Sequence, residues 1–540
     1  MVDRTISAAG PTPFLNPTDR IPISQGPFTP GKAAFTTPLQ LLPFVSAADF
    51  NASGSNATTT GTISATSTSL AVASAAGWVV GMGIAVAGAG TAGANLITSI
   101  TAIAGTTFTL AAAAVTAVTG AVVSHDDTAA LQACINYCFG SGSTTNGKYN
   151  SQANLTMFIP NGMYNVSTAL LIKDLVGGIV MGAGRYATML QDTSGNGIFV
   201  TNACSKSVFA HMTLTGISTS PILFNLDWDG GTAAGVNSNN ALQSNIFMNM
   251  AFDTGLIGLS LGTTGYMGSE TTIIGCSIAN FTTDGIAVQN FNALQNTVIG
   301  GNIARCGIGV HVYYGSACVY NTGFQQQVNW DFQQDNAAHT ACILSGIRTE
   351  STNFCRINTG SLAVKIVACS AVTATSGFFV YANADTISID SCYSNNGQIQ
   401  FHTVNGEICN SEVGRDDYIV TGSQGVIQSR NVLLPSSYIA SRTDFLGGAP
   451  PVYGGSTWSQ SIPYINTAAT VYGNVTSAQL IGVFGSPVTY ANRPTSPAVG
   501  MIANISDAGV NTFGANITTG GGLYQVCARW NGTNWTVMGI

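Results

Sequence analysis

Large apolar residues recur through the middle of the chain, each preceded by two small or polar residues. They stand 20 to 26 residues apart, except across one interval of 38 residues that contains a polar, loop-like stretch. Short strand-like runs bounded by Gly or Asn lie between them. A repeat of this length with three short strands predicts one coil of a parallel β-helix. The recurring positions are Leu214, Phe252, Ile278, Ile303, Phe324, Ile347, Val372, Tyr393 and Val413.

Two other repeat architectures fit this pattern less well. Leucine-rich repeats have a similar length but need Leu and Asn at fixed positions, which this chain lacks, and a propeller blade needs a period of about 40 residues. In a β-helix, the backbone groups of successive coils pair along the axis at a spacing of about 4.8 Å. We therefore predict an all-β chain whose main part, residues 124–432, is a right-handed parallel β-helix.

A helix is expected directly before the repeats, over residues 126–138. Asp126 and Asp127 precede its apolar positions and are interpreted as caps for the first free N–H groups. Such a helix can cover the open first coil, whose unpaired strand edges are otherwise sticky. A single apolar stripe at i, i+3, i+4 and i+7 is formed by Leu131, Cys134, Ile135 and Cys138.

The flanking segments have other patterns. Residues 1–46 are rich in proline, which forbids long strands or helices, so they are interpreted as an arm that orders against a partner. Residues 47–123 contain a small β module, because alternating runs are separated by Gly-rich turns. Residues 433–489 are a β-rich linker, and residues 490–540 are a small β module with a hairpin signal at Asn531-Gly532.

Charge narrows the classes of partner. Only 7% of the residues are charged, 45% are hydrophobic, and the formal net charge is −7 without any cluster of Lys and Arg. Nucleic-acid binding needs cations that neutralise phosphates, so no nucleic-acid partner is expected. A hydrophilic carbohydrate or another protein fits this surface better.

No membrane span or export signal is expected. Residues 1–10 contain Asp3 and Arg4 but no apolar core of a signal peptide. Residues 50–124 carry no charge, yet their longest small-and-apolar run, residues 75–90, is interrupted by Gly and is shorter than the roughly 18 residues of a spanning helix. A protein made in the bacterial cytoplasm and released by lysis fits this pattern.

The 12 cysteines form no Cys-x-x-Cys pair, and most lie within apolar stretches. We interpret them as buried free thiols rather than as a disulfide frame or a metal site. No cofactor or metal is expected.

The helix motif carries a family resemblance. Asp126-Asp-Thr-Ala-Ala-Leu-Gln-Ala133 resembles the "DDTAAIQAA" opening of the pectate-lyase superfamily β-helices found in phage tailspikes and tail fibres. In that family a segment of the type "DFGAxGDG" closely precedes the helix. Ala48-Asp-Phe-Asn-Ala-Ser-Gly-Ser55 resembles it, but the helix begins some seventy residues later, so the β module looks like an insertion.

The resemblance implies a protein of the phage virion that works at the host surface. It implies a homotrimer with an N-terminal arm that docks to the tail or baseplate, a β-helix that forms a stiff shaft, and C-terminal modules that meet the host surface with its polysaccharide or other receptor. Residues 19–42 resemble virion-attachment segments, and residues 490–540 resemble a C-terminal module of phage tail proteins. The fold itself does not decide activity, because it carries lyases, hydrolases and plain binders.

Catalysis has a weak sequence signal. A glycoside hydrolase needs two carboxylates about 5–5.5 Å or 6.5–9.5 Å apart. Asp390 and Glu412, on neighbouring coils and both expected to point outward, come closest and are the candidate catalytic pair. The motifs of polygalacturonases and the Asp cluster of pectate lyases are absent, and Asp284, before Gly285, is interpreted as a turn residue. We lean towards a non-enzyme, with a polysaccharide depolymerase as the enzymatic reading.

Binding is the less demanding function. Glycan sites combine aromatic platforms with carboxylates and amides. The histidines at positions 125, 211, 311, 339 and 402 have no motif partner and are interpreted as structural or surface residues, and nothing in the sequence points to a Ser-His-Asp triad. The candidate glycan-binding residues are Asp227, Trp228, Asp229, Tyr313, Tyr314, Trp330 and Asp331.

Three alternatives to a receptor-binding fibre remain open. One is an enzymatic tailspike that degrades or deacetylates host polysaccharide. Another is a structural whisker or collar fibre without a receptor. The last, a secreted pectate-lyase-like enzyme, is disfavoured because no signal peptide is seen.

Overall fold

A computed structural model provides the coordinates of the chain. The chain forms two compact units, residues 1–427 with 432–435, and residues 428–431 with 436–540, and each is described by itself. The described residues are 21–23, 34–36, 44–139, 155–173, 175–202, 204–227, 244–262, 268–335, 342–358, 364–372, 377–383, 386–395, 397–402, 405–413, 419–421, 426–430, 462–465, 487–497 and 499–539.

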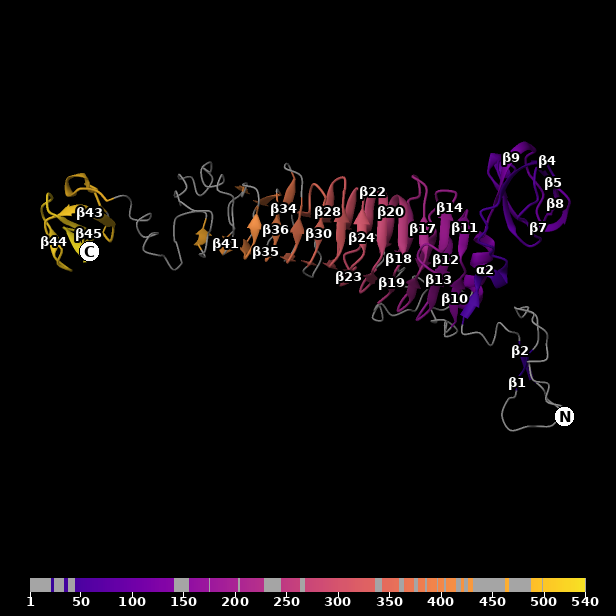
Figure 1. Ribbon diagram of the computed structural model, residues 1–540, viewed down its shortest axis with the longest axis horizontal. Coiled ribbons are helices and arrows are strands. Elements are labelled where there is room, and N and C mark those ends of the chain that lie inside the picture. Colours follow the sequence, from indigo (N-terminus) through magenta and orange to yellow (C-terminus); the bar gives the residue numbers. More distant parts are fainter. Residues whose placement is uncertain are drawn as a thin grey trace. The chain divides into compact units, whose positions relative to one another are not determined.

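The first unit is dominated by a parallel β-solenoid, in which strands of successive coils lie side by side (Figure 1). One sheet contributes one strand per coil, each paired in parallel with the strand of the next coil. Its strands are β3 (Phe44–Ser46), β10 (Thr156–Ile159), β13 (Ile179–Gly182), β16 (Val208–Ala210), β19 (Ile246–Met248), β21 (Thr272–Ile274), β23 (Asn296–Ile299), β26 (Ala317–Tyr320), β29 (Cys342–Ser345), β32 (Val364–Val367), β35 (Thr386–Asp390) and β38 (Asn405–Cys409).

A second sheet holds the other two strands of each coil in two ladders, which we call the middle and the outer ladder. The middle ladder comprises β11 (Gly162–Val166), β14 (Thr188–Asp192), β17 (Thr213–Thr215), the first halves of β20 (Ala251–Leu261) and β22 (Ser277–Val288), β24 (Asn302–Ala304), β27 (Gly323–Gln325), β30 (Arg348–Thr349), β33 (Ser370–Ala371), β36 (Tyr393–Ser394) and β39 (Glu412–Val413). The outer ladder comprises β12 (Leu170–Lys173), β15 (Phe199–Asn202), β18 (Ile222–Asp227), the second halves of β20 and β22, β25 (Ile308–Val312), β28 (Trp330–Gln334), β31 (Cys355–Ile357), β34 (Phe378–Ala382), β37 (Gln398–His402) and β40 (Ile419–Thr421).

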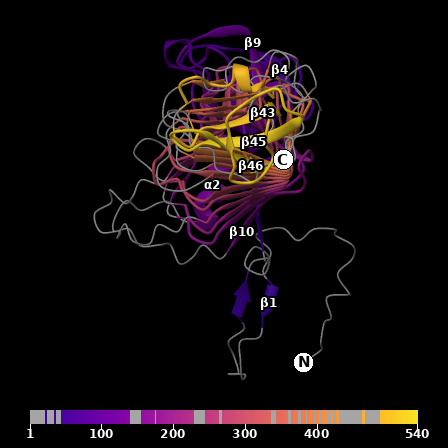
Figure 2. The ribbon, with the colours of Figure 1, turned by 90° about the vertical axis from the view of Figure 1, so that its left-hand side faces the viewer.

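Three strands per coil confirm the predicted parallel β-helix, and the coils stack in a column when viewed end-on (Figure 2). The predicted repeat positions are correct in the earlier coils, where Leu214, Phe252, Ile278, Ile303 and Phe324 pair in register and are buried.

Three later repeat positions are wrong. Phe324 pairs with Thr349 rather than with Ile347, and the register then continues through Ala371 and Ser394. Val372 and Tyr393, the residues beside the true positions, are exposed. Small residues occupy the interior here, so a search for large apolar residues selects a neighbour instead.

From His211 onward, the coils turn out of the first sheet through a residue in the left-handed backbone conformation. This corner position has φ between 48° and 66° in nine successive coils. Asn and Gly tolerate that conformation, whereas other residues incur strain. The corner residues are His211, Asn249, Gly275, Gly300, Asn321, Gly346, Ala368, Ser391 and Asn410.

The interior of the solenoid is apolar and contains free thiols. Phe199, Phe209, Phe224 and Phe247 form a cluster of rings with centroids 4.8 to 5.3 Å apart. All 12 cysteines are free, and all but Cys318 and Cys527 are buried, which confirms the interpretation as buried thiols.

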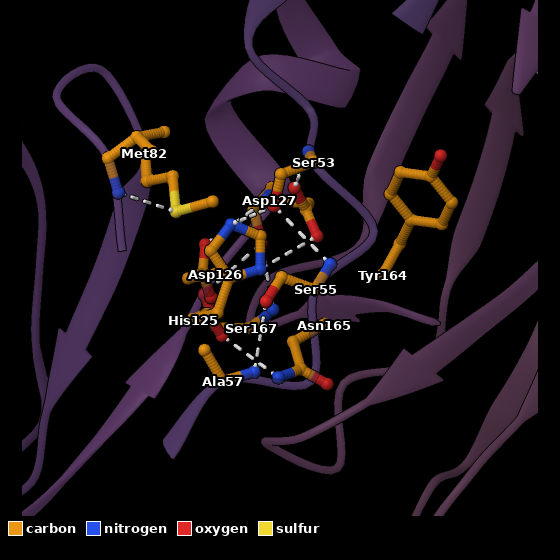
Figure 3. A network of polar contacts seen from close by, with 12 residues as sticks. Ser53, Ser55, Ala57, Met82, His125, Asp126, Asp127, Tyr164, Asn165 and Ser167 are labelled. Carbon is orange, nitrogen blue, oxygen red and sulfur yellow. Dashed lines mark hydrogen bonds and ion pairs between the residues drawn. The ribbon is translucent and has the colours of Figure 1, made fainter. Parts of the chain in front are cut away.

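Helix α2 (Thr128–Phe139) packs against β3, β10 and β12 at the first coil, as expected for a cap. Its buried residues are the predicted stripe together with Phe139. Asp126 caps the helix, since its Oδ1 accepts the Thr128 N–H at 3.1 Å. The Asp127 side chain does not, because it turns to Ser53 and His125 (Figure 3).

The inserted module is a closed antiparallel barrel with its own core, which includes Leu70, Trp78 and Phe108. Its first and last strands pair, and Thr58 lies opposite Ser124, so the insertion leaves and rejoins the solenoid at neighbouring points. The 3-10 turn η2 (Ala47–Phe50) precedes it, and η3 (Thr91–Gly93) lies within it. Its strands are β4 (Thr58–Ile63), β5 (Ser69–Val72), β6 (Gly83–Val86), β7 (Leu96–Ala104), β8 (Thr107–Leu110) and β9 (Val118–His125).

The second unit ends in a four-stranded antiparallel sheet of order β43-β45-β46-β44. Trp530 pairs with Trp535, so the predicted hairpin joins β45 to β46. The strands are β43 (Ile502–Ala508), β44 (Asn516–Ile517), β45 (Tyr524–Trp530) and β46 (Trp535–Gly539), preceded by η5 (Tyr490–Asn492). Three-residue strands β1 (Ile21–Ile23) and β2 (Ala34–Thr36) pair near the N-terminus, and β41 (Val426–Arg430) and β42 (Ile462–Ile465) are short.

Candidate ligand-binding face

One row of polar and aromatic side chains runs along the outer ladder of the solenoid. The positions before and after this row are interior, as shown by the buried Val310, Phe332 and Val380. Because side chains alternate between the two faces of a strand, the row between them points away from the interior. Within this row His311 and Gln333 are nevertheless buried, whereas Arg356 and Tyr381 are partly exposed. In register from coil to coil, the row consists of His311, Gln333, Arg356, Tyr381 and Gln400.

A second outward row lies two residues further along, where the strands end. The backbone ladder continues to these residues, since Asp335 N–H donates to Val312 O at 2.9 Å and Asn358 N–H donates to Gln334 O at 2.8 Å. The row consists of Tyr313, Asp335, Asn358 and Asn383. We call the two rows together the polar face.

An imidazole between two carboxylates forms the centre of the polar face. His311 Nδ1 lies 2.9 Å from Asp284 Oδ1, and His311 Nε2 lies 2.9 Å from Asp335 Oδ2. Tyr313 donates its hydroxyl to Asp284 Oδ2 at 2.9 Å, and its ring stacks on the imidazole with the centroids 3.6 Å apart. Gln333 donates to the other oxygen of Asp335 at 2.8 Å.

These contacts shift the pKa of His311 and that of Asp335 in opposite directions. Burial alone lowers the pKa of His311, but the hydrogen bonds to Asp284 and Asp335 outweigh it, and the pKa is raised. Burial alone raises the pKa of Asp335, but the hydrogen bond from His311 outweighs it, and the pKa is lowered. Both ring nitrogens of His311 face carboxyl oxygens, a geometry that favours the protonated imidazole.

An aromatic and arginine cluster adjoins this centre. The Arg356 guanidinium carbon lies 5.9 Å from the Trp330 ring centroid and 5.8 Å from that of Tyr381. Phe378 stacks on Trp330 with the centroids 5.9 Å apart. Arg356 Nε donates to Asn358 Oδ1 at 3.0 Å, and the Asn358 amide donates to Asp335 Oδ1 at 2.5 Å, so Asn358 joins the two clusters.

This arrangement suits binding better than hydrolysis. Each carboxyl oxygen lies 2.9 Å from one nitrogen of the same imidazole, so the two oxygens are at most about 8 Å apart. In an inverting glycoside hydrolase, a gap of this size between the two carboxyl groups holds the attacking water. Here the imidazole of His311 fills that space, and Asp284 is fully buried. What remains at the surface is a set of fixed rings, amides, a cation and a carboxylate.

Several predicted site residues lie on or beside this face. Tyr313 belongs to it, Trp330 supports Arg356, and Tyr314 is 43% exposed next to Tyr313. Asp331 does not face solvent. It is fully buried beside Thr349 and Ser351, and burial raises its pKa to about 8, so we leave it out of the binding surface.

Asp390 lies on the first sheet, just before the corner residue of its coil. Glu412 lies on the second sheet, just after the corner of the next coil. Asp390 accepts hydrogen bonds from Asn410 Nδ2 at 3.1 Å and Ser391 Oγ at 3.0 Å, which lower its pKa. A general acid needs a raised pKa, so the role open to Asp390 is that of a base. Glu412 is exposed and pairs with Tyr393. Their catalytic role stays a prediction.

Of the predicted Asp227, Trp228 and Asp229, the last two lie outside the described residues, and for Asp227 only the backbone at the end of β18 is described.

Sequence reasoning missed His311, Arg356, Asn358 and Asp284. Asp284 is not a turn residue, since it lies within β22 opposite Ile308. The coil register is the sequence signal that leads to the outward row. His311, Gln333, Arg356 and Tyr381 follow one another at intervals of 22, 23 and 25 residues, the length of one coil. Within the described part of the chain, no group of three or more His, Cys, Asp or Glu side chains could hold a metal ion.

Comparison with solved structures finds similar chains at low sequence identity. No family model and no curated protein sequence matches this chain. Similar solved structures include the catalytic domain of Agl-KA (12% identity, 66% of this chain and 77% of that chain, TM-score 0.41). Another is the A-module of Azotobacter vinelandii mannuronan C-5 epimerase AlgE4, with 13% identity over 57% of this chain and 93% of that chain and a TM-score of 0.41. A third is the enzymatically active domain of tailspike protein 2 of bacteriophage CBA120, with 10% identity over 63% of this chain and 52% of that chain and a TM-score of 0.36.

The sheet topology by itself shows an all-β chain built on a parallel β-solenoid. No helix among the described residues is long and apolar enough to cross a membrane.

Proposed function

We propose that this protein is a bacteriophage tail fibre or tailspike protein that binds host surface polysaccharide through the polar face of its solenoid. The observation that carries the proposal is the continuous outward row from His311 to Tyr381, held in register over four coils. The family resemblance of the helix motif supplies the phage context, and the face supplies the ligand class.

A polysaccharide is the ligand that these groups recognise together. Sugar rings present C–H faces that stack on aromatic side chains, and their hydroxyls pair with amides, carboxylates and guanidinium groups. Neighbouring coils lie about 4.8 Å apart, close to the spacing of successive sugar residues, so one chain can contact several coils. The fixed geometry of the row lowers the entropy cost of binding.

The remaining parts of the proposal concern assembly. The proline-rich arm, residues 1–46, docks to the phage tail or baseplate, and three copies form the shaft. Exposed apolar side chains on the solenoid support burial between copies, among them Phe291, Val328, Val372 and Tyr393. In the virion, the solenoid then presents the polar face to the host surface.

The binding proposal predicts that Tyr381→Ala and Arg356→Ala each weaken binding to bacterial surface polysaccharide by about tenfold, or about 1.4 kcal/mol. The reason is that each removes a stacking surface while the interior of the coil stays intact. Binding of the full chain to purified capsule and lipopolysaccharide from a panel of bacteria, followed by biolayer interferometry, measures it.

Tyr186→Ala is the matched control. Tyr186 is 66% exposed on an earlier part of the chain and also lies under an arginine, with Arg185 5.2 Å from its ring centroid. The Tyr186→Ala substitution should leave the affinity for the polysaccharide unchanged. Equal loss of affinity in all three variants, or in none, contradicts the assignment of the face.

A further inference from the structure

A Ser-His-Asp constellation lies where the inserted barrel meets the first coil, far along the chain from the polar face (Figure 3). Ser53 Oγ lies 3.0 Å from His125 Nε2, and His125 Nδ1 lies 3.1 Å from Asp127 Oδ2. The second contact is close but not well aligned as a hydrogen bond, which is common in catalytic sites without substrate. The order of contacts is that of a serine hydrolase: nucleophile, base, orienting acid.

The chain brings the three residues together through the insertion. Ser53 lies just before β4, and His125 ends β9, which pairs with β4. Asp127 follows at the start of α2. The hydroxyl and the imidazole therefore meet across 72 residues of sequence.

The constellation is held firmly. One carboxylate serves both partners, since Asp127 Oδ1 accepts the Ser53 N–H at 2.9 Å while Oδ2 faces His125. Asn165 holds the backbone on both sides, donating its side-chain amide to His125 O at 2.9 Å and accepting the Asp127 N–H at 2.8 Å.

The solvent exposure of the three residues matches their roles in a hydrolase. His125 and Asp127 are fully buried, whereas Ser53 is exposed. A buried acid and base keep their geometry, and an exposed hydroxyl can reach a group on a polymer.

We propose that Ser53 is the nucleophile of an esterase site that removes short acyl groups from the hydroxyls of a polymer. Ser53 Oγ attacks the ester carbonyl carbon and passes its proton to His125 Nε2. The C–O bond to the alcohol breaks, and His125 returns the proton to the departing alkoxide. Water then attacks the acyl-serine carbonyl carbon and passes a proton to His125 Nε2. The bond from that carbon to Ser53 Oγ breaks, the carboxylic acid leaves, and His125 returns the proton to Ser53 Oγ.

An N–H group is available for the developing oxyanion. Gly54 follows the nucleophile, the position that commonly supplies such a donor. Among the described residues no acceptor pairs with the Gly54 N–H. Gly54 has φ of 58°, and a Cβ there would lie 2.8 Å from the Tyr164 ring, so only glycine fits this turn. One backbone donor suits an ester, whose alkoxide leaves more readily than an amine.

A purely structural role explains fewer of these contacts. The Ser53 N–H bond to Asp127 is enough to tie the segment to α2. The Ser53 hydroxyl also accepts the Ser55 N–H at 3.3 Å, an ordinary turn contact, but this leaves its own proton for His125.

Reaction with a fluorophosphonate tests the proposal on the unaltered full chain. The Ser53 oxygen should form a bond to phosphorus as fluoride leaves, and peptide mapping by mass spectrometry should place the adduct on Ser53. Hydrolysis of p-nitrophenyl acetate should fall about 100-fold in Ser53→Ala.

Ser55→Ala is the matched control, because Ser55 lies in the same turn and its Oγ accepts the Ala57 N–H at 3.1 Å. It should keep both labelling and turnover. Absence of an adduct at Ser53 in the folded chain overturns the proposal, as does turnover by Ser53→Ala equal to that of the unaltered chain. The adduct does not depend on any variant folding. Glycan binding by the polar face is measured separately and can fail or succeed independently.

Discussion

At the residue scale, a left-handed corner is repeated in nine successive coils of the solenoid. Glycine and asparagine fill most of these corners, but Ala368 has φ of 53°. The left-handed conformation costs a residue with a Cβ roughly 1–2 kcal/mol, and glycine avoids this strain. Glycine offsets part of that gain, because its unfolded chain has more conformational entropy to lose on folding. Ala368 is thus a place where the sequence departs from the local optimum.

Ala368→Gly should therefore raise the free energy of unfolding by about 0.5–1 kcal/mol. Ala371→Gly, the same change three residues later in a buried strand, should lower it by at least about 0.5–1 kcal/mol. Urea titration followed by circular dichroism measures both. If the two variants shift in the same direction, strain at the corner is not the cause.

Asp331 is a second unusual residue, since a carboxyl fully buried in the solenoid titrates near pH 8. Its folded pKa is raised above the ordinary value of 3.8, so its contribution to stability is complete below about pH 4 and is lost as the pH rises through about 8. Asp331→Asn should therefore raise the melting temperature at pH 8 and leave it nearly unchanged at pH 4. A rise of equal size at both pH values contradicts a protonated Asp331.

The sequence predicts few of the functional residues at this scale. Tyr313 and Trp330 could be chosen because exposed or clustered aromatics are typical of glycan sites. His311 and Asp284 could not, because 27 residues separate them and only the coil register brings them together. The same holds for Ser53 and His125, whose contact depends on where an inserted barrel ends.

At the element scale, the coil is the unit that the sequence predicts well. Periodic burial of Phe252, Ile278 and Ile303 marks the coils correctly, and the capping helix follows from its apolar stripe. The prediction fails in coils whose interior positions are Thr349, Ala371 and Ser394, because small residues give no hydrophobic signal.

The barrel is an element of its own. Because Thr58 and Ser124 are cross-strand neighbours, residues 59–123 can be replaced by a two-residue Asn-Gly turn without moving the solenoid. We expect the shortened protein to keep the thermal transition of the solenoid within a few degrees, as followed by scanning calorimetry and circular dichroism.

A point substitution serves as the control for this deletion. Phe108→Ala, in the closed core of the barrel, should destabilise the barrel by about 3–5 kcal/mol and leave the solenoid transition in place. Loss of the solenoid transition in either protein shows that the barrel is part of the solenoid's fold.

At the scale of the whole molecule, low charge and exposed apolar side chains favour assembly. Only 7% of the residues are charged, so electrostatic repulsion between copies is weak. The proposed trimer predicts a sedimentation-equilibrium mass three times 55.4 kDa that does not change on dilution. A mass of 55.4 kDa at micromolar concentration contradicts it.

The polar face is the feature on which the functional account depends. Its rows lie on paired strands, and its central imidazole is held between two carboxyl groups, so the face is preorganised for an extended ligand.

Hydroxyl-radical footprinting of the full chain, with and without a bacterial surface polysaccharide that it binds, locates the ligand most directly. The account predicts that the polysaccharide protects Tyr381 and Tyr313 from oxidation and leaves Tyr186 unchanged. Protection of Tyr186, or of residues 487–539, while Tyr381 and Tyr313 react as before, would contradict it.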